Sequence, residues 1–282
     1  GKPGVIDNEG AITAHGGSVA LLGGTVLNNG LVVADYGTVA MGAGTAATLD
    51  FYGGGLLRLQ VSGDVKTNPT GAAAAVANNG TVQANGGQVL LTAAATQDVF
   101  ASAVNNTGVI RANRISNVGG VIELSGPDGI VSNSGTLDAS GKGGSSTGGT
   151  VEVTGQDVGL FTGSNINASG AAGGGTVLIG GGFHGADPNV ADASHTYVDT
   201  GTTIDADATT SGNGGNVVVW SNDGTRYYGS ISARGAGQGS GGSAEVSGEA
   251  YLDYDGQTDL RAPSGETGTL LLDPAEIEIT HD

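Results

Sequence analysis

The sequence contains no cysteine among its 282 residues, which excludes disulfide bonds and thiolate chemistry. Aromatic residues make up only 4% of the chain, while 38% of all residues are hydrophobic. A core is therefore possible, but Val, Ile, Leu and Ala have to build it. Side chains of this size fill a thin interior better than a broad one.

Basic residues are also scarce, with 9 Lys and Arg against 27 Asp and Glu and a formal net charge of −18. Nucleic-acid binding and attraction to an anionic membrane are disfavoured, since both need a basic footprint. We expect the acidic coat to keep a long β surface soluble. No apolar run reaches about 18 residues, so no segment is expected to cross a bilayer as a helix.

Glycine is abundant, with 56 residues, and it recurs inside a repeated phrase of the type Asn-x-Gly-x-Ile-x-Ala. The aliphatic residue and the Ala share one face of a strand. The Asn and Gly supply a turn that tolerates positive φ. Copies of the phrase, the last three without the Asn, lie at 8–14, 28–34, 78–84, 106–112, 133–139, 164–168, 202–206 and 229–233.

A second phrase follows each copy and consists of Gly, one polar residue and an alternating apolar strand, as at 86–91 and 149–153. A strand–turn–strand unit that keeps returning indicates a solenoid, because one unit cannot bury its own apolar face. Third strands are expected at 98–101, 129–132 and 157–161. We therefore predict an all-β fold, a right-handed parallel β-helix with about three strands per coil and roughly ten coils.

We predict that one file of inward side chains and stacked ladders of Asn and Gly run along the rod. The whole chain, 1–282, is expected to form a single β-helix segment with excursions at about 64–77 and 181–200. The Ala run in the first excursion is long enough for one helical turn at most. Because the chain starts in mid-pattern without an initiator Met, we interpret it as a fragment of a longer protein. The file comprises Ile12, Val32, Val82, Ile110, Leu137, Ile166, Ile204 and Ile231.

No motif predicts catalysis, a metal site or a cofactor. The segment 144–148 has the letters of a nucleophile elbow and 237–242 contains G-x-G-x-x-G, but neither precedes a predicted helix. The four histidines are scattered, and only His184 and His195 share a loop, where Asp187 or Asp192 would have to complete a metal site. We therefore predict that the protein is not an enzyme.

The few aromatic residues gather late in the chain, where rings at one level of the stack could form a platform for sugars. The alternative is that these rings cover the core or a turn and stack between coils. The predicted glycan or receptor contacts are Trp220, Tyr227, Tyr228, Tyr251 and Tyr254.

Four later phrases, at 174–181, 214–221, 242–248 and 268–274, resemble the filamentous-haemagglutinin type of two-partner-secretion exoprotein in their order and spacing. These exoproteins are large β-helical adhesins of Gram-negative bacteria. The resemblance covers nearly the whole chain and is to the body beyond the family's secretion region, whose Asn-Pro-Asn type motifs this sequence lacks. It implies a rod, export by an outer-membrane partner transporter of the full-length protein, and attachment to cells or matrix.

We therefore predict a structural and adhesive segment of a secreted bacterial surface or biofilm-matrix adhesin that attaches to host-cell or matrix glycans or receptors. Because the rod is acidic, a glycan should be neutral or bridged by cations. Lateral or end-to-end self-association stays open. Two alternatives are the delivery stalk of a contact-dependent growth-inhibition toxin and a polysaccharide-processing β-helix enzyme. The first needs a C-terminal toxin domain, and the second needs acids or bases aligned on adjacent coils.

Overall fold

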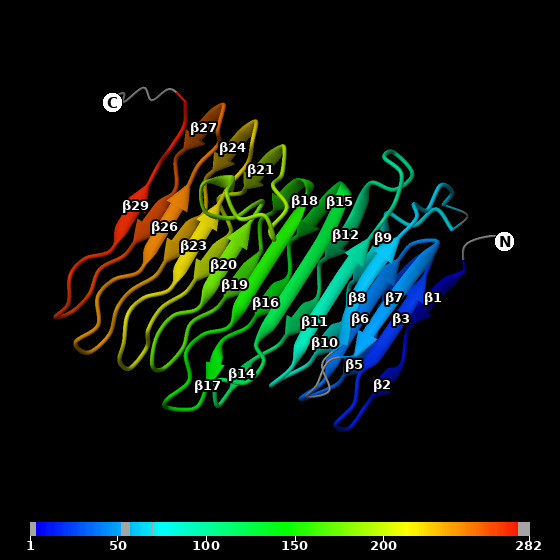
Figure 1. The fold of residues 1–282 in the computed structure, drawn as a ribbon, viewed down its shortest axis with the longest axis horizontal. Helices are drawn as coiled ribbons and strands as arrows, with labels where there is room; N and C mark the ends of the chain where they lie inside the picture. Colours follow the sequence, from blue (N-terminus) through cyan, green and yellow to red (C-terminus); the bar gives the residue numbers. More distant parts are fainter. Residues whose placement is uncertain (1–3, 52–56, 69, 276–282) are drawn as a thin grey trace.

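The computed structural model describes residues 4–51, 57–68 and 70–275, and its regular structure is almost entirely β (Figure 1). The one helical element in these ranges is a single 3-10 turn, η1 (Phe183–Gly185). None of the described helices has the length and apolar character to cross a membrane. The strands stack side by side into an elongated parallel β-helix (Figure 1).

Each coil contributes one strand to each of three faces, in chain order. Over the described residues, the second face contains nine strands, close to the roughly ten coils predicted. β15 (Val121–Asn133) and β18 (Thr150–Leu160) bend from the third face into the first, so these two faces form one continuous sheet.

The first face is completed by β1 (Val5–Asn8), β4 (Thr25–Asn28), β9 (Ala74–Asn78), β12 (Ser102–Asn106), β21 (His195–Val198), β24 (Gly224–Tyr227) and β27 (Tyr251–Tyr254). The second face comprises β2 (Ala11–Thr13), β5 (Leu31–Val33), β10 (Thr81–Gln83), β13 (Val109–Arg111), β16 (Thr136–Asp138), β19 (Asn165–Asn167), β22 (Thr203–Asp205), β25 (Ser230–Ser232) and β28 (Gln257–Asp259). The third face is completed by β3 (Val19–Gly23), β6 (Thr38–Ala43), β11 (Gln88–Ala93), β20 (Thr176–Ile179), β23 (Asn216–Val219), β26 (Ser243–Val246) and β29 (Thr269–Leu271). A two-stranded parallel pair, β14 (Arg114–Ile115) and β17 (Gly141–Lys142), extends one edge.

The predicted inward file is confirmed. On the second face, Val32 is in register with Ile12 and Val82, and the same parallel register continues coil by coil to Ile204 and Ile231. All members of the file are buried except Ile12, which is half-buried in the first described coil. Strand alternation therefore directs these aliphatic side chains into the thin core of Val, Ile, Leu and Ala.

The predicted asparagine ladder is also present, at the turn between the first and second faces. The Nδ2 of Asn8 donates to Oδ1 of Asn28 at 2.7 Å, and the same 2.7 Å bond links each later Asn to the next. The Asn side chains are buried, and buried polar groups need hydrogen-bond partners. Each side-chain amide in the ladder finds its partner in the amide of the next coil. The ladder is Asn8, Asn28, Asn78, Asn106 and Asn133, and it ends on Ser164.

Glycine in the same turn is required by the close approach of the coils. A Cβ on Gly80 would lie 2.1 Å from the carbonyl oxygen of Gly30, and one on Gly108 would lie 2.2 Å from that of Gly80. No side chain fits at such a distance, which explains why Gly recurs two residues after the Asn.

The excursions differ from their predicted limits. The first begins earlier, because β7 (Ala46–Phe51) and β8 (Leu57–Ser62) form an antiparallel hairpin. It ends earlier too, since the Ala run lies in strand β9 and not in a helical turn. The second also ends early, because β21 resumes the coil at His195. The predicted strand at 98–101 is wrong: this segment forms a turn and a bend, and the strand starts at Ser102.

Both excursions fold onto the outer surface of the third face. The amide of Leu57 in the hairpin donates to Thr38 Oγ1 at 2.9 Å. Toward the other end of the rod, the loop at 180–194 packs against the buried Trp220, since a Cβ on Gly185 would lie 2.8 Å from its ring. The amide of His184 in this loop donates to Oε2 of the buried Glu245 at 3.1 Å. The loop is therefore docked onto the sheet and does not project as a free recognition loop (Figure 1).

Candidate binding groove

The outer surface of the first face carries two rows of side chains that cross successive coils. In the first row, Asp157, His195, Gly224 and Tyr251 are in register. The second row contains Gly159, Tyr197, Arg226 and Asp253 in the same order. Residues between the rows, such as Val158 and Thr225, point into the core, as strand alternation requires.

A groove of about 430 Å³ runs along these rows, and the glycines make room for it. The Phe161 ring lies over Gly159, where a Cβ would be 2.8 Å from the ring. The rings of Tyr251 and His195 lie close to Gly224, since a Cβ added there would be 3.7 Å from the first ring and 3.9 Å from the second. The groove therefore has a backbone floor and largely aromatic walls.

The groove exposes an unusual amount of apolar surface for a chain with so few aromatic residues. Ile130, Phe161 and Tyr251 are 43%, 44% and 52% exposed, and all three line it. Asp157, His195 and Arg226 supply polar groups at the same place. An exposed apolar patch with a polar rim is typical of an interaction site.

A chain of rings makes one wall rigid. The centroid of Tyr197 lies 5.9 Å from that of Phe161 and 6.0 Å from that of Tyr228. The Tyr228 hydroxyl donates to Asp253 at 2.6 Å, and this bond, with burial and the charge of Asp253, raises the pKa of Tyr228 to about 12. The phenol therefore stays protonated and keeps its place at neutral pH.

The charged groups of the groove differ in their pairing. His195 Nδ1 lies 2.9 Å from Asp157 Oδ1, and both side chains are well exposed. Within the part of the chain that the structure describes, Arg226 forms no ion pair within 4.0 Å. A ligand can thus meet one free guanidinium and the exposed carboxylate of Asp157.

The five aromatic residues predicted as contacts separate into two groups. Tyr251 lines the groove, and Tyr228 supports its wall. The structure corrects the prediction for Trp220 and Tyr227, because both rings are buried and cannot reach a ligand. Tyr254 stacks on Tyr227 with centroids 5.5 Å apart and is half-buried, so stacking between coils describes these residues better than a platform does.

Sequence reasoning missed Ile130, Phe161, His195, Tyr197 and Arg226 as lining residues. Their common signal is position: each lies in the strand of its coil that precedes the Ile-x-Ala phrase, or directly beside that strand. Aligning these strands coil by coil would have placed most of them on the outer face.

His184 and His195 do not converge on a shared site. His184 Nδ1 lies 3.2 Å from Asp273 and 3.8 Å from Glu245, whereas His195 pairs with Asp157 in the groove. Across residues 4–51, 57–68 and 70–275, no group of three His, Asp or Glu side chains is arranged to hold a metal ion.

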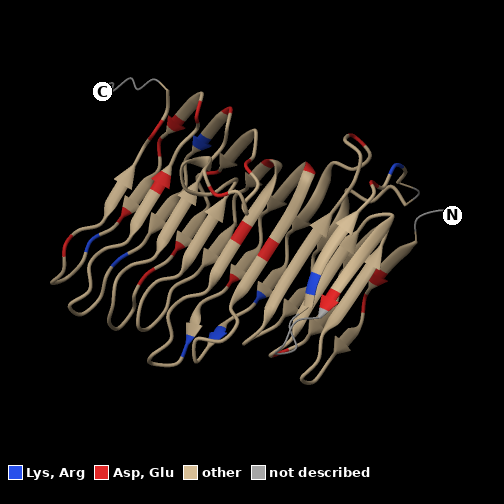
Figure 2. Cartoon of the chain, in the orientation of Figure 1, with Lys and Arg blue, Asp and Glu red and all other residues tan. Residues whose placement is uncertain are grey.

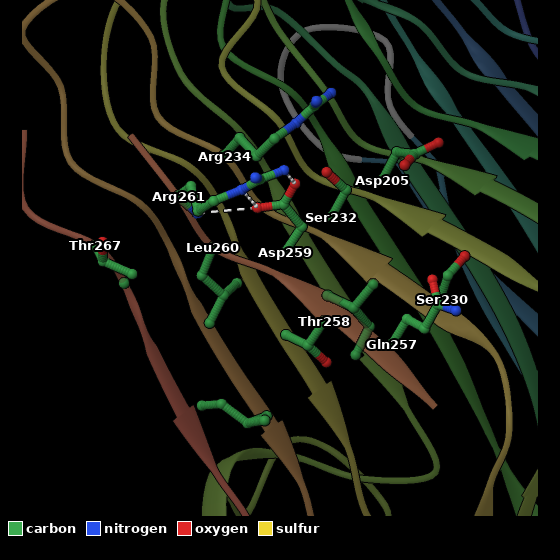
Figure 3. A pocket seen from close by; sticks show the side chains of 13 residues that line it. Asp205, Ser230, Ser232, Arg234, Gln257, Thr258, Asp259, Leu260, Arg261 and Thr267 are labelled. Atoms are coloured by element: carbon green, nitrogen blue, oxygen red, sulfur yellow. Dashed lines mark hydrogen bonds and ion pairs between the residues drawn. The ribbon is translucent and has the colours of Figure 1, made fainter. Parts of the chain in front are cut away.

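A second hollow, of about 680 Å³, lies beside β28 in the last described coil (Figure 3). Both of its guanidinium groups already have partners: Arg261 pairs with Asp259 at 2.7 Å, and Arg234 with Asp207 at 2.6 Å. The Asp259 pairing, chiefly the hydrogen bond from Arg261, lowers the pKa of Asp259 to about 2. This hollow therefore offers a ligand few unpaired groups.

The outer surface of the third face carries acidic residues on the neighbouring strands β15 and β18 (Figure 2). Glu123 and Glu152 are in register there, between the hairpin and the loop at 180–194. Burial, and then the charges of Glu123 and Asp187, raises the pKa of Glu152 to about 7.

This carboxyl group predicts a pH-dependent stability. Folded Glu152 binds its proton more tightly than the unfolded chain does, so its contribution to stability falls as pH rises from about 4.5 to about 7. We expect Glu152→Gln to be more stable than the natural protein at pH 8, with the difference shrinking toward pH 4.5. Urea unfolding at the two pH values measures this, and an equal difference at both would contradict it.

No family model matches the chain, and a search of curated proteins finds no match. Among solved structures, the chain is similar to the crystal structure of the HMW1 secretion domain from Haemophilus influenzae, with a TM-score of 0.74 and 26% identity. The match supports a fold of the two-partner-secretion exoprotein type, and the matched structure is a secretion domain, whereas the sequence phrases resemble the body beyond that region. It covers 95% of this chain but 66% of that one, so the chain spans just under two thirds of the matched structure.

Proposed function

We propose that this chain is a rod-like segment of a secreted bacterial adhesin, and that its groove on the first face binds neutral glycans of host cells or of a biofilm matrix. The groove carries the proposal, because exposed Tyr251 and Phe161 offer faces for sugar rings beside the Asp157 carboxylate, which can accept hydrogen bonds from hydroxyl groups. The net charge of −18 favours an uncharged ligand. The rigid β-helix holds this surface in a fixed geometry.

Export belongs to the same proposal. The similarity to a secretion domain and the resemblance to filamentous-haemagglutinin-type exoproteins both support passage through an outer-membrane partner transporter. The full-length protein would then act outside the cell, at the surface or in the matrix. The test is co-expression with a candidate transporter, with secretion into the medium as the expected result.

Tyr251→Ala is expected to weaken glycan binding about tenfold, because loss of one stacking ring costs about 1.4 kcal/mol, the equivalent of tenfold in Kd. Glycan-array screening followed by calorimetry measures the change. Tyr36→Ala is the matched control, since Tyr36 is 59% exposed and lies outside the groove. Binding that persists unchanged in both Tyr251→Ala and Phe161→Ala would place recognition elsewhere.

One observation favours a second candidate, a polysaccharide-processing enzyme. Glu123 and Glu152 lie on adjacent strands, which are about 4.8 Å apart, and the raised pKa of Glu152 suits a general acid. We propose no chemistry for the groove itself, so a glycan-cleavage assay distinguishes the enzyme from the glycan-binding adhesin. Glycan cleavage that Glu152→Gln abolishes would establish the enzyme, and intact glycan after prolonged incubation would exclude it.

A further inference from the structure

A smaller hollow of about 290 Å³ adjoins the groove on the first face. Gln97, Asp98 and Phe100 lie on its far side, in the turn before β12. Ile130 and Asp157 line both hollows, so they form the boundary between them. The two hollows therefore meet along one line of side chains.

That line follows the first outward row across six coils. Ile130 is in register with Asp157, and the row continues through His195 to Tyr251. At the other end, the register of Val104 with Val131 places Ala103 beside Ile130. With strands about 4.8 Å apart, the row from β12 to β27 is roughly 24 Å long.

The smaller hollow is rich in side chains that form hydrogen bonds with hydroxyl groups, and none of its lining residues is Lys or Arg. Gln97 Nε2 donates to Gln156 Oε1 at 2.5 Å, which links the turn to β18. Asp98, Asp128 and Asp157 add carboxylates, and the half-buried Phe100 adds an apolar surface. This charge pattern disfavours an acidic ligand and suits an uncharged, hydroxyl-rich one.

We infer that the two hollows form one extended cleft for a linear, uncharged oligosaccharide that lies along the rod axis, crossing the strands. The inference rests on the proposed glycan-binding function and adds the shape and direction of the ligand. A repeat of about 4.8 Å between strands is close to the length of one sugar unit, so the cleft takes about five units. Tyr251 holds one end of the ligand and the Gln97 turn holds the other.

The test measures affinity against ligand length for the folded chain, with cello-, malto- and chito-oligosaccharides of two to eight units as probes. We expect affinity for the bound series to rise by about 100-fold between two and five units and then to level off. Gln97→Ala should weaken binding of the five-unit ligand about fivefold and leave the two-unit ligand unchanged. Tyr251→Ala should weaken both.

The outcomes distinguish the inference from the proposed function. Affinity that is flat beyond two units, or an equal effect of Gln97→Ala on short and long ligands, overturns the extended cleft and leaves a single glycan-binding groove. Ile130→Ala, at the boundary between the two hollows, is a second variant and should weaken binding of the longer ligands only. If no neutral glycan binds while an extended uncharged peptide does, both the cleft for glycans and the proposed function are overturned.

Discussion

Replacing Ile166 with Asp is expected to unfold the coils on either side of it. Ile166 is fully buried and is in register with Leu137 and Ile204, so the new carboxyl group would lie in a purely aliphatic file. Even protonated, a carboxyl group without a hydrogen-bond partner costs several kcal/mol in such a place. Domains are stable by about 5–15 kcal/mol in total, so this is a large part of the whole.

Limited proteolysis with mass spectrometry should find new cleavage sites between about residues 137 and 204, and urea unfolding should give a lower midpoint. Asn165→Asp is the matched control, because it adds the same group one residue away on an exposed, outward position. The control should change stability by no more than about 0.5 kcal/mol. Equal protease resistance of the two variants would contradict an inward Ile166.

The repeated phrases predicted the file and the ladders because the information that sets them is local. Side chains alternate along a strand, so the spacing of Ile166 and Ala168 alone assigns both to one face. The Asn-x-Gly turn then repeats at every coil, and stacking of identical turns follows from a parallel arrangement. Residues such as Asn78 and Gly80 thus carry their structural role in their position within the phrase.

The excursions could not be predicted in the same way, since their structure depends on distant partners. The Ala run before Asn78 fits a helical turn or a buried strand equally well by composition. Pairing of β9 with β4 and β12 decides for the strand. The hairpin of β7 and β8 likewise depends on the third face, where Thr38 and Gln88 hold Leu57 through its backbone.

The groove was only partly predictable for a related reason. Tyr227 and Tyr251 are both strand tyrosines, yet one points inward and the other outward, because Tyr251 is in register with Gly224, an odd number of residues (three) before Tyr227. Loops of different length separate the coils, so the register that places His195 and Tyr251 on the two strands next to Gly224, and Phe161 near Tyr197, emerges only in three dimensions. Charge and composition nevertheless pointed to an uncharged ligand.

The asparagine ladder leads to the second large effect. Asn106→Leu keeps the volume of the side chain but removes the central link between Asn78 and Asn133. The Nδ2 of Asn78 then loses its 2.7 Å acceptor and keeps only the longer contacts with the carbonyl oxygens of Gly80 (3.4 Å) and Val109 (3.5 Å), and the Oδ1 of Asn133 loses its donor in the same buried turn. Each buried polar group left without a partner costs about 1–3 kcal/mol, so we expect a loss of about 2–6 kcal/mol.

Asn79→Leu is the control for this change. Asn79 belongs to a parallel outer ladder, in which its Nδ2 donates to Asn29 Oδ1 at 2.9 Å, but it is exposed and water can replace the bond. The control should therefore cost less than about 1 kcal/mol. In the double variant of Asn78→Leu and Asn106→Leu, the loss should be smaller than the sum of the single losses, because the two residues share one hydrogen bond. Strictly additive losses, or an equal effect of Asn79→Leu, would show that the buried ladder is not what joins these coils.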